Sequence, residues 1–235
     1  PAALDLICKQ AEAAVRGGKL ILRLSDRYRE QGNVPVHARL ATGAVQHHLV
    51  NCGRRCDANI SVETGVARDP HHFACLIGYG ATAVYPYLVY QSLHDIAQRG
   101  NIDKQQQLGR SYRRGIRKGL LKILSTMGIC TRASYRGSQL FDAVGFAPEV
   151  TALCCPKVAS KIGGAGFAEL EADVERQTEH AWLEPVRPTR DGLYRFMCGG
   201  EEHAYNPDVV MSLQHAVASG DWQDYRTFAD AVDRR

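Results

Sequence analysis

The chain has 235 residues, which is enough for one large domain or for one domain with an additional segment. Its 29 Lys and Arg residues against 25 Asp and Glu residues give a formal net charge of +4. This mild excess does not predict nucleic acid as a partner. No run approaches the roughly 20 apolar residues that span a bilayer, so we expect no membrane partner either.

The eight cysteines are irregularly spaced and lie largely within apolar runs. A chain of this length does not depend on disulfides for its stability. The N-terminal residues also lack the apolar region of a signal peptide. We therefore interpret the cysteines as reduced core thiols of a cytoplasmic protein.

The first third of the chain alternates helical and strand patterns. Residues 4–16 carry apolar groups at helical spacing, and residues 19–26 form the pattern of a buried strand. A second amphipathic helix is expected over residues 37–50, followed by a second strand at 58–64. This alternation predicts parallel βα units.

A third unit begins at Asp69 and Pro70. Asp can cap free N–H groups, and Pro suits the first helical position because its missing N–H would be unpaired there. The helix leads to a short strand in residues 82–88. Three parallel strands with helical crossovers place the chain in the α/β class, as a partial sheet that is either barrel-like or open.

From about residue 90 the patterns become mainly helical. Helices are expected at 88–99, 103–127, 167–183, 207–218 and 221–233. The segment "SKIGGAGF" (160–167) reads as a glycine-rich bend, and "LYRFMCGG" (193–200) as a short strand. "EPVRPTRDG" is the best candidate for a linker. We therefore expect one domain over 1–184, and a linker with the start of another over 185–235.

Two predicted strands end in carboxylates, Asp26 and Glu63. The C-terminal ends of parallel strands are where α/β proteins place their sites. His72 lies close by, in the first turn of the third helix, with His71 before it and Cys75 after it. We favour a capping and hydrogen-bonding role for these groups. The alternative is a free-standing small α/β enzyme that uses Asp26, Glu63 and His72.

His48, Cys52 and Cys56 lie at i, i+4 and i+8, so an unbroken helix would stack them on one face. Nitrogen and sulfur donors are what zinc prefers. However, Gly53 is expected to end the helix before Cys56, and lone cysteines are commonly buried. Ordinary packing is therefore favoured, with a metal-binding module on these three residues as the alternative.

Several long strings carry a family resemblance: "VETGVARDPHHFACLIGYGATAVYPYL", "YRRGIRKGLLKILSTMGICTRASYRGSQLFDAVGF", "SKIGGAGF" and "GGEEHAYNPDVVMSLQHAVASGDWQDY". Together they resemble the large (alpha) subunit of bacterial glutamate synthase over essentially the whole chain. The resemblance implies the C-terminal part of the central domain, followed by the segment that leads into the FMN-binding domain. This region is then a fragment of an oxidoreductase of glutamate biosynthesis and ammonia assimilation.

The resemblance also implies where the chemistry lies. The parent enzyme has an amidotransferase domain upstream, and an FMN-binding barrel with a 3Fe-4S cluster downstream. Its partners for this region are the remaining domains of the large subunit, with a small NADPH-oxidising subunit as a further partner. No family motif falls on a residue here, so no catalytic, cofactor-binding or metal-binding residue is assigned, and the fragment itself is expected not to be catalytic.

One loop and three departures complete the comparison with the family. The loop "GGEEHAYNP" is expected near the domain junction, with Glu201, His203 and Asn206 as its candidate residues. Arg23 interrupts a strand expected to be apolar, Thr126 stands where Lys is usual, and Glu202 stands where Tyr is expected. These departures suggest a divergent copy of the family.

Overall fold

The computed structural model describes residues 1–28, 30–100, 105–183, 192, 195–201 and 203–233. The chain divides into two compact units, Pro1–Trp182 and Leu183–Arg235. The assignment of 1–184 and 185–235 to two domains of a longer protein stays a prediction.

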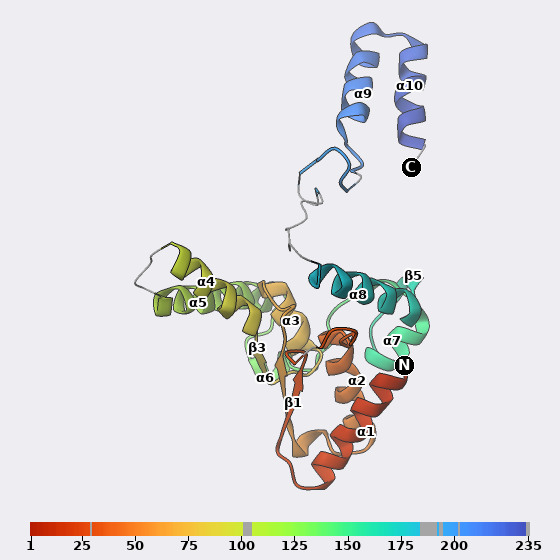
Figure 1. The fold of residues 1–235 in the computed structure, drawn as a ribbon. Coiled ribbons are helices and arrows are strands. Elements are labelled where there is room, and N and C mark those ends of the chain that lie inside the picture. The colour runs from red at the N-terminus through yellow and green to blue at the C-terminus, as the bar shows by residue number, and fades with distance from the viewer. Residues whose placement is uncertain (29, 101–104, 184–191, 193–194, 202, 234–235) are drawn as a thin grey trace. The chain divides into compact units, whose positions relative to one another are not determined.

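The first unit is a mixed α/β structure. Its elements are α1 (Ala2–Arg16), β1 (Ile21–Ser25), α2 (Ala38–Asn51), η1 (Arg55–Asp57), β2 (Asn59–Glu63), α3 (Pro70–Gly78), β3 (Ala83–Tyr85), α4 (Tyr87–Arg99), α5 (Gln105–Thr126), α6 (Arg132–Tyr135), β4 (Ala143–Phe146), α7 (Pro148–Cys154), β5 (Ser160–Ala165) and α8 (Phe167–Ala181). Figure 1 shows their course from α1 in red to α8 in blue-green.

The first three strands form one parallel sheet in the order β1–β2–β3. Ser25 of β1 pairs with Glu63 of β2, and Glu63 pairs in turn with Tyr85 of β3. α2 connects β1 to β2, and α3 connects β2 to β3. The predicted parallel βα units are confirmed, and the sheet is open: within the described residues no barrel closes.

β2, the central strand of this sheet, is the most deeply buried of the three. Ile60 and Val62 of β2 are 0% and 1% exposed, and they join the main core with the apolar faces of α1 and α2. On α2, Gly43 lets the helix approach α7 closely, because a Cβ at this position would overlap the backbone carbonyl oxygen of Cys154. The close packing of α2 therefore depends on a residue without a side chain.

The predicted start of the third helix is confirmed. The Asp69 carboxylate accepts a hydrogen bond from the backbone N–H of His72 at 3.1 Å, and Pro70 occupies the first turn. The sequence predicts this helix start correctly because the Asp69 cap and Pro70 both act within the first turn of the helix.

The prediction of a buried first strand is wrong. β1 lies at an edge of the sheet, and Ile21 is 70% exposed. The Arg23 side chain is 63% exposed, with its Nε 3.9 Å from Glu63 Oε2. An Arg in this strand thus carries none of the cost of a buried unpaired charge.

A second sheet replaces the predicted glycine-rich bend. β4 and β5 pair in parallel, with α7 as their connection. Gly164 makes the pairing possible, because a Cβ there would overlap the backbone of Gly145 on β4. A glycine-rich segment predicts a bend, but here the glycine permits two strands to approach closely.

In the described part of the second unit, α9 (Pro207–Ser219) and α10 (Trp222–Asp233) pack against each other as a hairpin (Figure 1). Gly220 ends α9 in the left-handed region with φ of 66°. The predicted strand at 193–200 is wrong for residues 195–200, which form turns and bends; residues 193 and 194 lie outside the described part. No helix in the described residues has the length and apolar character required to cross a bilayer.

Candidate functional site

Polar side chains at the C-terminal ends of β1 and β2 are joined by hydrogen bonds, and we call this group the strand-end network. It consists of Ser25, Asp26, Arg27, Glu63 and Thr64. Glu63 is 5% exposed. Its carboxylate accepts a hydrogen bond from Ser25 Oγ at 2.8 Å and one from Arg27 Nη1 at 3.2 Å. The Ser25 hydrogen bond, followed by that of Arg27, holds the pKa of Glu63 below its ordinary value.

Asp26 is engaged in the same network. Thr64 Oγ1 donates to Asp26 Oδ2 at 2.5 Å, and the backbone N–H of Gly65 donates to Oδ1 at 3.0 Å. Thr64 itself is fully buried. Both strand-end acids therefore accept hydrogen bonds that fix the loops following β1 and β2, as capping predicts.

His72 serves the start of α3 instead of joining these acids. Its Nδ1 accepts a hydrogen bond from the backbone N–H of Arg68 at 3.2 Å and lies 3.6 Å from an Asp69 oxygen. The predicted hydrogen-bonding role is what the contacts display. The alternative enzyme site needs His72 to act together with Asp26 and Glu63, and no contact described here gives it that geometry.

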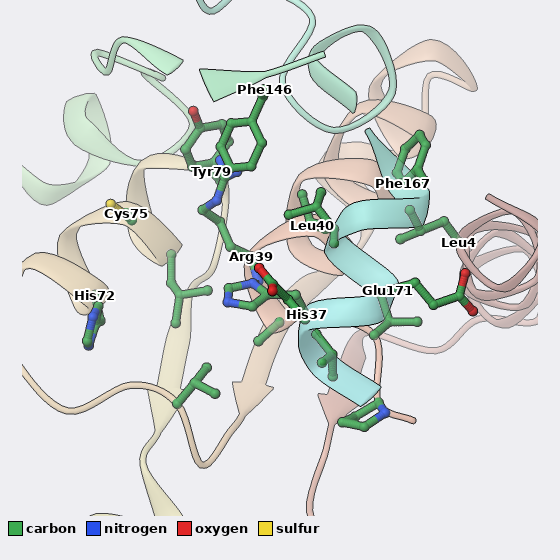
Figure 2. Close-up of a pocket in the computed structure, with 18 of the residues that line it drawn as sticks. Leu4, His37, Arg39, Leu40, His72, Cys75, Tyr79, Phe146, Phe167 and Glu171 are labelled. Atoms are coloured by element: carbon green, nitrogen blue, oxygen red, sulfur yellow. The ribbon is translucent and has the colours of Figure 1, made fainter. Parts of the chain in front are cut away.

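A cavity of about 770 Å³ lies beside the sheet, between α2, α3, the β4 region and α8 (Figure 2). Among its described lining residues are His37, His72, Cys75 and Glu171, but neither Asp26 nor Glu63. Arg39 extends from α2 over the rings of Tyr79 and Phe146, 5.0 and 5.1 Å from their centroids. These cation–π contacts hold α2 against the end of α3 and against β4 of the second sheet.

The cavity contains one thiol–imidazole pair, Cys75 and His71. Cys75 Sγ lies 3.5 Å from His71 Nε2, at the i, i+4 spacing of α3. A nucleophilic cysteine requires a lowered pKa, because the thiolate is the reactive form. Burial instead raises the pKa of the Cys75 thiol. The pair therefore lacks the electrostatics of a catalytic dyad.

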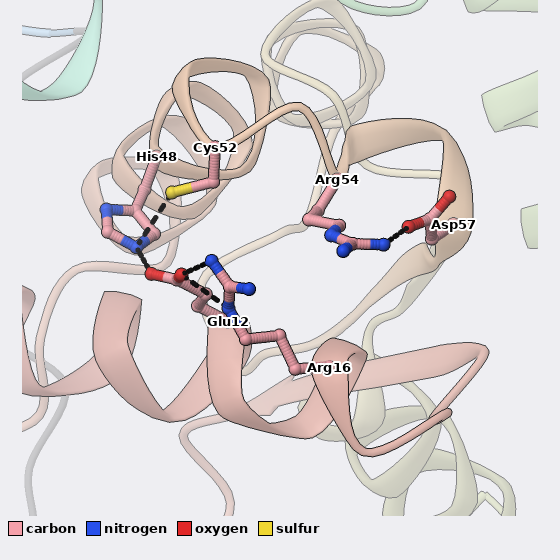
Figure 3. Close-up of polar contacts among 6 residues, drawn as sticks. All are labelled: Glu12, Arg16, His48, Cys52, Arg54 and Asp57. Atoms are coloured by element: carbon pink, nitrogen blue, oxygen red, sulfur yellow. Dashed lines mark hydrogen bonds and ion pairs between the residues drawn. The ribbon is translucent and has the colours of Figure 1, made fainter.

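A second polar group joins the first two helices, and we call it the helix-pair cluster: Glu12, His48 and Cys52 (Figure 3). His48 Nε2 lies 2.8 Å from Glu12 Oε2 and 3.7 Å from Cys52 Sγ. Cys56, the third ligand of the alternative metal module, is instead exposed in η1. α2 ends at Asn51, before Cys56, as expected from Gly53, so the three residues of the alternative metal module do not stack on one helix face.

Charge and hydrogen bonding shape the helix-pair cluster. Arg16 Nη2 lies 2.7 Å from Glu12 Oε1, leaving Oε2 toward His48. The Arg16 hydrogen bond, followed by that of His48, lowers the pKa of Glu12 to about 2. Burial and Glu12 raise the pKa of the Cys52 thiol. Glu12 was missed from the sequence because nothing local predicts that α1 lies beside α2.

The junction candidates all fall in the second unit. Asn206 caps α9, with its Oδ1 accepting from the backbone N–H of Val209 at 3.0 Å. His203 Nε2 contacts the carbonyl oxygen of Gly192 at 2.6 Å, and Glu201 is exposed. Their place near a domain junction stays a prediction.

The eight cysteines are free, but only Cys8, Cys154 and Cys155 are buried. Cys56, Cys130 and Cys198 are exposed, so the interpretation of the set as core thiols holds for a minority. A cysteine within an apolar run is not necessarily buried, because a helix places only one of its faces in the core.

Two further positions at which the chain differs from the family strings are Thr126 and Glu202. Thr126 is exposed near the end of α5, and its Oγ1 donates to the carbonyl oxygen of Lys122 at 3.0 Å. Glu202 lies outside the described residues.

Comparisons with known proteins agree on one family. Residues 1–147 match the model of the glutamate synthase central domain. The chain is 35% identical over 227 residues to the NADPH glutamate synthase large chain of Bacillus subtilis (strain 168), covering 95% of this chain and 15% of that protein.

Two further relatives are named as a ferredoxin-dependent and an NADH glutamate synthase. The ferredoxin-dependent glutamate synthase of Pyropia yezoensis is 34% identical over 247 residues, covering 99% of this chain and 16% of that protein. The NADH glutamate synthase of Saccharomyces cerevisiae (strain ATCC 204508 / S288c) is 34% identical over 242 residues, covering 94% and 11%. The chain thus spans about a sixth or less of each of these relatives, and it belongs to the glutamate synthase central-domain family.

Proposed function

We propose that this chain is a non-catalytic scaffold region of a glutamate synthase. The parent reaction converts glutamine, 2-oxoglutarate and a reductant into two molecules of glutamate. One observation carries the proposal: the likeness to glutamate synthases runs through nearly the whole chain, whereas the acids at the sheet edge are bound up with their own neighbours. Such acids stabilise a fold, and they leave the chemistry to other domains.

The scaffold has a physical task in this reaction. Ammonia released from glutamine must reach the 2-oxoglutarate site without being protonated or lost to solvent. Walls that exclude water prevent such side reactions. The region would hold the amidotransferase and FMN domains in register and contribute part of those walls.

The described residues do not fit a 3Fe-4S cluster. Such clusters are held by cysteine thiolates that lie close together. Among the described residues, the single group of three potential metal ligands contains one cysteine, Cys52. The cluster and FMN are therefore assigned to other domains of the parent chain, and no step is routed through them here.

The proposed partners are the remaining domains of the large subunit and a small NADPH-oxidising subunit. The relatives are named for NADPH, NADH or ferredoxin, so the electron donor differs within the family. We propose the cytoplasm as the compartment, on the basis of eight free cysteines.

The domain-junction role of Glu201, His203 and Asn206 can be tested in the full-length enzyme. Each is replaced by Ala, and glutamate formed is measured against glutamine hydrolysed. We expect glutamine hydrolysis to continue while less of its ammonia appears as glutamate. If coupling is unchanged in all three variants, the junction role is excluded.

Two controls separate this role from stability. Asn206→Asp keeps an oxygen acceptor for the cap of α9, so it distinguishes loss of the cap from loss of a junction contact. Asp230→Ala changes an exposed residue of α10 in the same unit and should leave coupling intact.

A further inference from the structure

The helix-pair cluster brings three different donor atoms to one point. Glu12 Oε2, His48 Nε2 and Cys52 Sγ all lie within 4.8 Å of one another (Figure 3). Carboxylate oxygen, imidazole nitrogen and thiolate sulfur are the three ligand types that zinc accepts in proteins. Neither the family likeness nor the scaffold role accounts for this combination.

The observed spacings are close to those of a tetrahedral zinc site. Zinc bonds of about 2.3 Å to sulfur and about 2.0 Å to nitrogen or oxygen give ligand separations of about 3.6 Å for S–N and about 3.3 Å for N–O. His48 and Cys52 are separated by 3.7 Å, and His48 and Glu12 by 2.8 Å. The His48–Glu12 pair must open by roughly 0.5 Å, and the Glu12 and Cys52 ligand atoms, which lie within 4.8 Å, must settle at about 3.6 Å. Side-chain rotations supply both changes.

The frame that carries these ligands is well packed. His48 lies one turn before Cys52 on α2, the i, i+4 spacing that places two side chains on one helix face. The opposing faces of α1 and α2 are buried, with Val45 and Leu49 both at 0% exposure. The backbone positions of the ligands are therefore fixed before any ion arrives.

The ligands also have the exposure that such a site requires. The side chains of His48 and Glu12 are 30% and 23% exposed, so an ion can enter and water can occupy a fourth position. Arg16 binds Glu12 Oε1 and leaves Oε2 directed at His48. Hydrogen bonds of this kind orient ligating carboxylates in metal sites.

We propose that Glu12, His48 and Cys52 form a zinc site with three protein ligands and one open position. The site joins α1 to α2 and lies apart from the strand-end network. Its ion ties two segments that are 36 residues apart in the chain and thus adds a cross-link to the scaffold.

The test is metal titration of the reduced protein after removal of bound metal with a chelator. Co(II) is added first, because a thiolate ligand gives a near-ultraviolet charge-transfer band, and Zn(II) is then used to displace it. We expect one equivalent of Co(II) to produce the band and one equivalent of Zn(II) to remove it. Zinc should also raise the Tm, since it binds only the folded arrangement.

Variants separate this site from other thiols. Cys52→Ser should abolish the band, whereas Glu12→Gln should weaken zinc binding by at least about tenfold and keep the band. Cys56→Ser and Cys130→Ser remove exposed thiols outside the cluster and should bind zinc like the parent chain. Circular dichroism confirms that each variant is folded.

Two results would overturn the proposal. One is the absence of a cobalt band or a zinc-dependent Tm shift at one equivalent in the parent chain. The other is binding by Cys52→Ser and Glu12→Gln that equals the parent, because the ion would then lie elsewhere. Should Cys52→Ser not fold, Glu12→Gln decides alone, since it alters a partly exposed side chain.

Discussion

The strand-end network and the helix-pair cluster each centre on a glutamate whose pKa is lowered by hydrogen bonds, but the surroundings of the two carboxylates differ. Glu63 is buried and accepts hydrogen bonds from Ser25 and Arg27. Glu12 is partly exposed and faces His48 and Cys52, besides Arg16. The first carboxylate accepts hydrogen bonds from a hydroxyl and a guanidinium group, whereas the second has an imidazole and a thiol beside it.

Position in a fold therefore does not by itself identify a chemical site. The strand-end network occupies the place where α/β proteins usually carry chemistry, yet its atoms are committed to one another. The helix-pair cluster lies on the outer side of two packed helices, where the fold gives no such expectation. The set of partners around a carboxylate decides its role.

The largest expected effect comes from displacing α2, which carries one side of the helix-pair cluster. Gly43→Ala places a methyl group against the backbone of Cys154 and should destabilise the protein by about 3 kcal/mol. Gly115→Ala on α5 meets open space and should stabilise it by about 0.5–1 kcal/mol. Urea unfolding measures both, and equal effects would show that α2 is not closely packed.

A smaller loss is expected within the strand-end network. Thr64→Val keeps the side-chain shape but removes the hydrogen bond to Asp26, at a cost of about 1–2 kcal/mol. Thr82→Val is the matched control, because Thr82 is exposed and bonds Asn59 at 3.3 Å; it should change stability by less than about 0.5 kcal/mol. A neutral Thr64→Val would contradict the structural role of the network.

The smallest expected effect is the dependence of protein stability on pH and salt, which should differ between Glu63 and Glu12. A folded-state pKa below the unfolded value of 4.5 gives stability that is present above that pH and is lost as pH falls through the folded value. For Glu12 this window extends down to about pH 2.

Thermal unfolding from pH 7 to pH 2 measures both contributions. Glu63→Gln and Glu12→Gln should each flatten the acid limb of the Tm curve. High salt should reduce the Glu12 contribution more, because salt screens exposed charge pairs much more strongly than buried ones. Equal salt sensitivity would remove the distinction between the two sites.

Much of the fold follows from local sequence signals. Asp69 and Pro70 fix the start of α3, and the alternation of helix and strand predicts the parallel sheet. β5 was missed because Gly163 and Gly164 resemble a bend, and only the approach of Gly145 shows why glycine is needed. Non-local pairing is what local patterns do not contain.

The strand-end network could be predicted from the sequence more fully than the helix-pair cluster. Asp26 and Glu63 were correctly placed together, because adjacent parallel strands end at one edge. The proximity of His48 and Cys52 follows from helical spacing, and Cys56 of the alternative metal module lies beyond the end of α2, as expected from Gly53. Glu12 replaces Cys56 because α1 and α2 pack side by side, a contact that the spacing of residues within one helix does not predict.

The most direct measurement is turnover of the full-length enzyme with Glu63→Gln or Asp26→Asn, normalised to folded protein. Both variants should lower the Tm, because each weakens the strand-end network. At temperatures where they remain folded, kcat and the ratio of glutamate formed to glutamine hydrolysed should equal those of the parent enzyme. A loss of turnover of about 100-fold in folded enzyme, with a shifted pH profile, would show that these acids take part in the chemistry and are not structural.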